Sequence, residues 1–375
     1  MLALAACACA RSSAPLGLAP PLALPEAHSP AFRDQLLAAV HRSADYLARA
    51  CGEDGRFLYR VDVKSGRVLG GYNILRHAGA MYALAQYQAS WPRPQVKAAL
   101  LRAARYLRRE HMLPVGDMLP VWSEPRRREA KLGGAGLALM ALGEIERVAP
   151  GTTSQADLAA LARFIAFMQK PDGSFYSKYF SGGGRDDGFV SLYYPGEAAL
   201  GMLVIDERSV ALKALLALAK ARRGHDHVPA DHWALLATAR LPLRLPLGEI
   251  EERDALMTHG VQVAESILAE RVAHPAGSPL AGCFGEDGRT TPTATRLEGL
   301  LALLPLLPAE HPLRARIQSA ADQGVAFLLR AQVRRGLHRG AIPASLTSHE
   351  ARIDYTQHAL SAWMQYLHIS AAAGS

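Results

Sequence analysis

The sequence of 375 residues contains few cysteines, few lysines and no long apolar run. No uninterrupted apolar stretch reaches the roughly 18 residues that a bilayer span needs, which argues against a protein with several membrane-spanning helices. Cys51 and Cys283 lie far apart and have no CxxC spacing, so neither a zinc knuckle nor a redox motif is predicted. Only seven of the 42 basic residues are lysines, and the arginines are scattered rather than gathered in the basic stripe typical of nucleic-acid binding.

The composition is that of a folded chain. Half of the residues are apolar and 20% are charged, which is typical of a globular protein and not of a disordered one. The net charge is +8, an excess compatible with an anionic substrate. We predict no nucleic-acid partner and no cofactor.

The N-terminal segment differs from the rest. Leu4-Ala5-Ala6-Cys7 resembles a bacterial lipobox, in which Cys7 would carry a lipid anchor, although no basic segment precedes it. Residues 12–30 are rich in Pro, Ala and Ser, as in a flexible tether. We therefore expect a signal-like segment and tether over 1–30 and one domain over 31–375. The expected location is the periplasm or the membrane surface, with a cytoplasmic protein as the alternative.

From residue 31 the chain repeats one unit, a helix followed by a Gly-containing loop and a second helix rich in small residues. Apolar residues recur at i, i+3, i+4 and i+7, which predicts helices rather than strands. Six such pairs fit the sequence. Their predicted ranges are 36–51 and 74–88, 97–110 and 133–147, 156–169 and 195–205, 208–222 and 231–241, 250–271 and 295–306, and 314–333 and 354–368.

The two helices of each pair differ in polarity. The second helices, for example residues 133–142 and 196–203, are apolar nearly all round and are therefore expected to be buried. The first helices carry a charged face. This pattern predicts an all-α fold in which six inner helices form a ring inside six outer helices, an (α/α)6 toroid. Residues 57–61 and 189–193 could add small β-ribbons in the loops.

One loop carries a family resemblance. Gln169-Lys-Pro-Asp-Gly-Ser-Phe175 is similar to the Q-x3-G-x-W/F element of squalene cyclase and prenyltransferase repeats, and Gln332-x3-Gly336 and Cys51-x3-Gly55-x-Phe57 are weaker matches. The layout also resembles the toroids of six-hairpin glycosidases and polysaccharide lyases. These resemblances imply the toroid fold. The D-x-D-D acid of squalene cyclases is absent, and Asp186-Asp187 does not match it.

Polar residues collect at the starts of the predicted inner helices. Asp231 and Asp354 are good helix caps, but capping does not explain arginines and histidines at equivalent positions. Buried charges are costly unless they are paired or functional, so this ring is interpreted as a pocket. Its candidate residues are Arg76, His77, Trp122, Lys131, Tyr194, Glu197, Asp231, His232, Arg296, Glu298, Asp354, Tyr355 and His358.

These residue types favour a carbohydrate substrate, because aromatic rings stack on sugars and charged groups bind hydroxyls. We expect Glu197 and Asp354 to be the acid/base pair of a carbohydrate-active enzyme, and the other candidates to bind the substrate. Hydrolysis is preferred to elimination or epimerisation of a uronic acid, in which Arg would neutralise the carboxylate and Tyr or His would move the proton.

Two alternatives remain open. An isoprenoid cyclase or prenyltransferase-like enzyme would have a drier and mainly apolar cavity. A non-catalytic binding toroid would use the same carboxylates only as helix caps. His225-Asp-His227, with Asp231 and His232, could bind a metal, but the stretch is a loop without further ligand spacing, so no metal is predicted.

Overall fold

The structure is a computed structural model that describes residues 24–126, 128–241 and 250–373. Cys7 and most of the predicted tether lie outside these ranges. Twelve α-helices, a 3-10 helix at Leu304–Leu306 and five strands of three residues each belong to the described secondary structure. Among these residues, no helix combines the length and the apolar character that crossing a membrane would require.

Six helices form the outer wall of the molecule. Their apolar stripes face inward and their charged faces are exposed, as in α3, where Val96, Leu100 and Leu107 are buried. The outer helices are α1 (Pro30–Ala50), α3 (Pro94–His111), α5 (Gln155–Phe167), α7 (Arg208–Arg222), α9 (Ile250–Ala269) and α11 (Leu313–Ala331).

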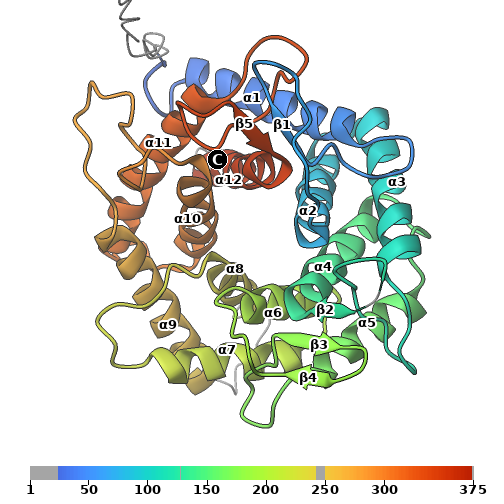
Figure 1. Cartoon of the computed structure of the whole chain (residues 1–375). Coiled ribbons are helices and arrows are strands. Elements are labelled where there is room, and N and C mark those ends of the chain that lie inside the picture. The colour runs from blue at the N-terminus through green and yellow to red at the C-terminus, as the bar shows by residue number, and fades with distance from the viewer. Residues whose placement is uncertain (1–23, 127, 242–249, 374–375) are drawn as a thin grey trace, which may run out of the picture.

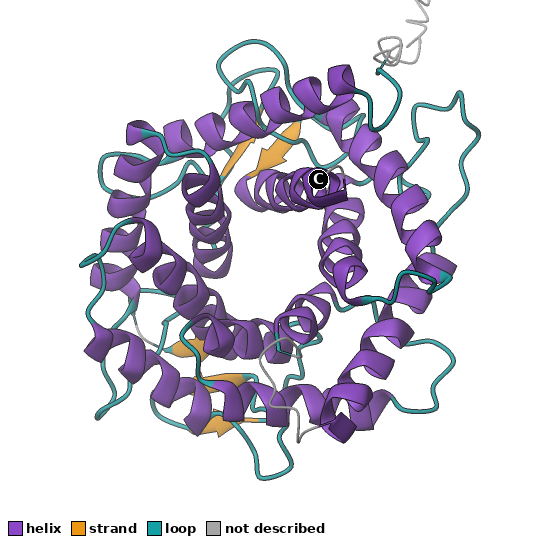
Figure 2. Ribbon diagram, turned by 180° about the vertical axis from the view of Figure 1, so that it is seen from behind, coloured by secondary structure: helices purple, strands orange, loops and turns teal. Residues whose placement is uncertain are grey.

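The other six helices form a closed inner ring. Each inner helix packs against the next, and the last packs against the first, so that the ring has no free edge (Figures 1 and 2). The inner helices are α2 (Ile74–Ser90), α4 (Leu132–Val148), α6 (Tyr194–Val204), α8 (His232–Arg240), α10 (Thr290–Leu303) and α12 (Ile353–Ala373). The predicted (α/α)6 toroid is confirmed.

Glycines bring inner helices into close contact. A Cβ atom on Gly136 of α4 would lie 2.6 Å from the backbone of Glu197 in α6, and one on Gly201 would lie 2.5 Å from the Gly136 carbonyl oxygen. On the other side of α6, a Cβ on Gly196 would lie 2.5 Å from the Ala234 nitrogen in α8. Glycines therefore set the spacing between α4 and α6 and between α6 and α8.

The repeated loop has a defined structural role. The Gln169 side-chain amide donates to the carbonyl of Val210 in α7 (2.9 Å), and the Gln332 amide donates to the carbonyl of Ala39 in α1 (2.8 Å). The Cys51 thiol makes the equivalent contact with the Ala99 carbonyl of α3 at 3.4 Å. In each case a residue one or two positions after an outer helix fastens the loop to the next outer helix.

A glycine then packs against the same helix one turn later. Gly55, Gly173 and Gly340 have positive φ angles of 88°, 89° and 100°, and their Cα atoms face backbone carbonyls of α3, α7 and α1. The predicted match Gln332-x3-Gly336 is therefore right in its glutamine and wrong in its glycine. This loop is four residues longer, and no atom lies within 4 Å of a Cβ built on Gly336.

Five short strands lie at the starts of inner helices. β1 (Arg60–Asp62) pairs antiparallel with β5 (Glu350–Arg352), with Val61 opposite Ala351, and so links the first and last repeats. β2 (Glu129–Lys131), β3 (Lys178–Phe180) and β4 (Gly184–Asp186) form a second antiparallel sheet in the order β2-β3-β4. The ribbon predicted over 57–61 is confirmed only at its end. The one predicted over 189–193 is wrong, because β4 precedes that segment.

Substituting the packed glycine of the repeat tests this account. In Gly173→Ala the new Cβ would lie 2.5 Å from the Lys213 carbonyl oxygen at a φ of 89°, so both backbone strain and overlap oppose folding. We expect a loss of roughly 2 to 4 kcal/mol in the free energy of unfolding, measured by urea denaturation. Gly66→Ala is the matched control, because Gly66 has a φ of 75° but open space around it. Equal losses in the two variants would contradict the packing role.

Candidate functional site

A cavity of about 560 Å³ opens at the N-terminal ends of the inner helices. Residues from α2, α6, α8, α10 and α12 line it, together with Leu137 of α4. The strands β2 and β5 lead directly into α4 and α12 and so bring chain segments to this end of the ring. The first turns of inner helices carry partial positive charge, which favours anionic groups there.

Seven of the predicted site residues meet in this cavity. They are Arg76, Tyr194, Glu197, His232, Arg296, Asp354 and His358. Tyr193, Trp233, Asn73 and Gln357 also line it and add two aromatic rings and two amides. The cavity is therefore polar and aromatic at once.

The other six predicted residues do not line the cavity. Glu298 and Asp231 lie directly behind it and contact its residues, as described below. The remaining four contact other parts of the protein instead of the cavity. They are His77, Trp122, Lys131 and Tyr355.

Their contacts show why these four lie elsewhere. The two His77 nitrogens lie 2.7 Å from the Tyr72 hydroxyl and 3.1 Å from the Ala103 carbonyl, between α2 and α3, and burial lowers the pKa of His77 to about 3. The Trp122 indole donates to the Leu113 carbonyl (3.0 Å). Lys131 pairs with Glu129 (3.1 Å), and the Tyr355 ring lies 4.3 Å under the Arg352 guanidinium.

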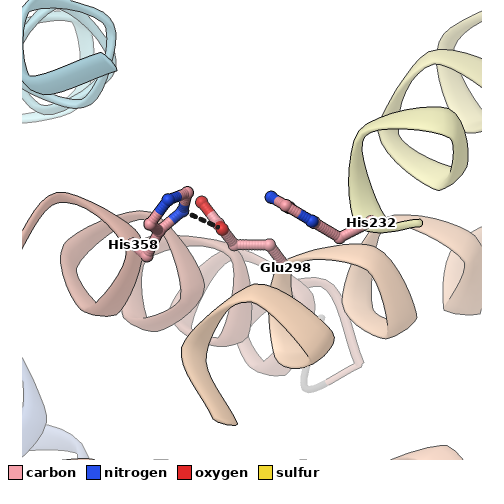
Figure 3. A group of neighbouring side chains, drawn as sticks. All are labelled: His232, Glu298 and His358. Carbon is pink, nitrogen blue, oxygen red and sulfur yellow. Dashed lines mark hydrogen bonds and ion pairs between the residues drawn. The ribbon is translucent and has the colours of Figure 1, made fainter. Parts of the chain in front are cut away.

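Two histidines and a glutamate converge on the cavity from three helices (Figure 3). His358 Nδ1 lies 2.6 Å from Glu298 Oε2, and the Glu298 carboxylate is fully buried behind the imidazole ring of His358. The His232 and His358 rings meet edge to face with centroids 5.4 Å apart. His232 is only 3% exposed, and neither of its nitrogens has a hydrogen-bond partner among the described residues.

The two histidines have opposite protonation tendencies. Burial, the neighbouring His358 and Arg296 together hold the pKa of His232 well below its ordinary value, so His232 is neutral near pH 7. Burial also opposes the charged form of His358, but the charge of Glu298 and the hydrogen bond to it outweigh that effect and raise the pKa of His358. A neutral imidazole therefore lies beside one that readily holds a proton, and this pairing suits acid/base chemistry.

Asp354 is neutralised by two arginines. The Arg352 guanidinium donates to both of its oxygens, at 2.5 and 2.9 Å, and Arg76 Nε lies 3.1 Å from Oδ2. Arg76 also donates to the Tyr59 hydroxyl. These contacts occupy both oxygens of Asp354 with fixed partners, so neither oxygen is free to act on a substrate.

Glu197 lies in the opposite situation. Burial and the nearby charge of Asp231 raise the pKa of Glu197 to about 8, and its Oε2 has no hydrogen-bond partner among the described residues. Gly133 makes room for it, because a Cβ there would overlap both Glu197 Oε2 and the Tyr194 ring. Glu197 is thus a neutral acid near pH 7.

Asp231 anchors the start of α8. Its Oδ1 accepts from the Ala234 backbone amide (3.0 Å), and its Oδ2 accepts from Arg222 (2.7 Å). Arg222 also contacts His259 at 3.2 Å. The cap interpretation therefore holds for Asp231, which fixes the first turn of α8, where His232 stands.

Among the described residues, the side chains placed to hold a metal ion are His232, Glu298 and His358, whose ligand atoms all lie within 4.8 Å of one another. Two imidazoles and a carboxylate suit zinc. His225 and His227, which the sequence offered as a metal pair, are exposed in a loop.

Sequence reasoning missed two cavity arginines, Arg289 and Arg352. Arg352 stands two residues before the candidate Asp354, and this closeness in sequence could have indicated that Arg352 belongs to the same site. Arg289 precedes α10, whose start was predicted at 295 but lies at Thr290. The Thr290 hydroxyl donates to the Pro343 carbonyl (2.6 Å), a tertiary contact that extends the helix beyond what local propensity suggests.

The shifted pKa of Glu197 makes a testable contribution to stability. Between its ordinary value of 4.5 and about 8, the folded state keeps a proton that the unfolded state has lost. The contribution of Glu197 to the free energy of unfolding therefore falls as pH rises from 5 to 8. Glu197→Gln should remove this component, on the order of a few kcal/mol, in urea unfolding at both pH values. Exposed Glu286→Gln is the control, and an unchanged pH dependence in Glu197→Gln would contradict the protonation state.

No protein-family model matches this chain, and no curated protein matches it in sequence. Solved structures do match. A D-mannose isomerase shares 12% identity at a TM-score of 0.63, over 92% of this chain and 100% of that one. A GH76 alpha-mannanase from Bacteroides thetaiotaomicron shares 8% at 0.61, over 91% and 97%. A type II terpene cyclase from Scytonema shares 14% at 0.55, over 91% and 99%. The resemblance to both toroid groups is thus confirmed at the level of fold.

Proposed function

We propose that the chain is a carbohydrate-active enzyme that moves a proton on a sugar, as an isomerase or epimerase, with His232 and His358 as the acid/base pair. The observation that carries this proposal is the pair itself. Two imidazoles of opposite protonation tendency lie 5.4 Å apart in one polar cavity. The fold alone does not decide the chemistry, because it is shared by an isomerase, a mannanase and a terpene cyclase.

The chemistry follows from the two protonation states. His232 as the neutral base takes the proton from the carbon next to the sugar carbonyl, and that C–H electron pair forms the new C=C bond of an enediol. The carbonyl oxygen takes a proton from the charged His358. Return of a proton to the former carbonyl carbon, with loss of the hydroxyl proton from the neighbouring carbon, gives the ketose. Return of a proton to the opposite face of the carbon that lost it, with loss of the proton that the carbonyl oxygen took up, gives the epimer.

Other cavity groups suit this intermediate. Negative charge develops on the substrate oxygens when the C–H bond breaks, and fixed donors aimed at such charge lower the barrier. The Arg76 guanidinium is held in place by Asp354 and Tyr59 and lines the cavity. Protonated Glu197 adds a neutral donor. Asn73 and Gln357 can bind hydroxyl groups, and the rings of Tyr193, Tyr194 and Trp233 offer stacking surfaces.

Glycoside hydrolysis, which the sequence favoured, is the second candidate. Its support is Glu197, a carboxylic acid whose pKa is raised to about 8 and which faces the same cavity as Asp354. Arg76 and Arg352 occupy the carboxylate oxygens of Asp354, so the histidine pair is the stronger candidate. The polar lining disfavours the isoprenoid alternative. An envelope location with a lipid anchor at Cys7 stays a prediction.

Turnover by the histidine pair can be tested directly. The purified protein is incubated in D2O with a panel of aldoses, ketoses, sugar acids and sugar phosphates, and proton NMR follows exchange of the C–H next to the carbonyl. We expect exchange and formation of an isomer, with a loss of roughly 100-fold or more in His232→Asn and in His358→Asn. Exposed His227→Asn is the matched control and should keep full activity.

The same assay separates the alternatives. Full activity in His232→Asn or His358→Asn would contradict the assignment of these histidines as the acid/base pair. Reducing ends released from glycosides, with the release lost in Glu197→Gln, would establish hydrolysis instead. Binding of a sugar without exchange or cleavage across the panel would favour a non-catalytic toroid.

The pH profile of kcat/KM tests the role of Glu298 as a positioning residue. Activity needs His232 neutral and His358 charged, so it should fall below the lowered pKa of His232 and above the raised pKa of His358. Glu298→Gln removes the anion that favours charged His358, so the upper limb should move to lower pH while the lower limb stays. An upper limb unchanged in Glu298→Gln would contradict the role of the ion pair.

A further inference from the structure

The charges that line the cavity are unbalanced. Four arginines line it, and only two carboxyl groups do, of which Glu197 is neutral near pH 7. Asp354 is the remaining anion, and Arg76 and Arg352 both bond to it. The other two arginines, Arg289 and Arg296, are thus not matched by any acid in the cavity lining. A charge excess in a confined polar space attracts an anionic ligand.

Arg289 and Arg296 have only loose partners. Arg296 Nη2 lies 3.5 Å from Glu270, whose side chain is 44% exposed, and its Nη1 donates to the Pro292 carbonyl of its own helix at 3.3 Å. Arg289 Nε lies 3.9 Å from Asp287, and both side chains are about 60% exposed. The Arg289 pair is exposed and long, and the Arg296 pair is partly exposed, with the Arg296 side chain 25% exposed. Such pairs contribute little, so either guanidinium can turn to a ligand at small cost.

The two arginines belong to one helix start. Arg289 is the N-cap of α10, and its side chain makes no capping bond. Arg296 stands seven residues later, which is close to two helical turns and therefore on the same face. Between them, the Thr291 hydroxyl is buried, lines the cavity and has no hydrogen-bond partner among the described residues. The helix start adds its own partial positive charge.

This group lies beside the histidine pair. Arg296 is among the charges that lower the pKa of His232, and it also acts on the Tyr193 hydroxyl across the cavity. His232 supplies a second buried group without a partner, at 3% exposure. A ligand with one end on Arg289, Arg296 and Thr291 would thus extend toward His232.

We propose that the substrate is an anionic sugar, whose phosphate, sulfonate or carboxylate group binds Arg289, Arg296 and the Thr291 hydroxyl at the start of α10. The sugar part rests on the proposed function. The anion site rests on the charges and on these side chains alone. A neutral monosaccharide would leave both arginines without a strong partner.

Binding calorimetry with three matched probes tests the proposal. Glucose, glucose 6-phosphate and glucuronate share a ring and differ in the group at one end. We expect at least one anionic probe to bind 10-fold or more tighter than glucose, and its affinity to fall as salt rises from about 50 to about 300 mM. The comparison of glucose 6-phosphate with glucuronate identifies the preferred anion.

Substitutions of the two arginines test where the anionic group binds. Arg296→Gln and Arg289→Gln should each weaken the anionic probe about 10-fold and change glucose binding little. Arg105→Gln is the matched control, because it removes one charge from an exposed position on α3. Circular dichroism checks that each variant is folded. The conservative Arg296→Lys keeps the charge and should retain part of the affinity.

The outcomes separate this inference from the proposed function, because binding needs no turnover. If neither anionic probe binds tighter than glucose, or if the arginine variants bind as the wild type does, the anion site is overturned even for an active isomerase. If the anionic probe binds through Arg296 but no sugar exchanges its C–H, the anion site stands and the histidine chemistry falls.

Discussion

The inner helices are apolar on nearly every side, and this constraint governs the rest of the molecule. Such helices are stable only if every face is covered, so they close into a ring whose outer side is covered by a second layer of helices. Glycines such as Gly136 and Gly201 let neighbouring helices approach until backbone meets backbone. The ring leaves little room for polar groups along its walls, and several charged residues of the inner helices lie near the helix ends. Arg76, Glu197 and Asp354 are in first turns, whereas Glu144, Arg147 and Arg240 are in or next to last turns.

Two ways of holding buried charge operate at this end of the ring. Asp231 is satisfied completely, by Arg222 and by the backbone of α8, and it acts as structure. Glu298 is paired with His358, a group that itself faces the cavity. The first arrangement orients His232, and the second sets the protonation of its partner. One ion pair fixes the first turn of α8, and the other includes a histidine that lines the cavity.

Much of the fold could be predicted from the sequence, because helix periodicity and the loop glycines are local signals. All six helix pairs lie close to their predicted ranges. The site could be predicted only in part. Arg76 and His77 are adjacent, yet Arg76 faces the cavity and His77 faces α3, since about 100° separates them around the helix. The Glu298–His358 pair joins residues 60 apart, which no local pattern reveals.

The polar atoms left without partners define what the cavity can accept. Buried donors and acceptors are normally satisfied, since each unsatisfied one costs about 1 to 3 kcal/mol. Both His232 nitrogens, Glu197 Oε2 and the Thr291 hydroxyl are buried without partners among the described residues, and all three side chains line this one cavity. They include a hydroxyl, a protonated acid and a neutral imidazole, which can both donate and accept. A ligand rich in hydroxyl groups satisfies such a set, whereas a hydrocarbon would leave every one of these groups unpaired.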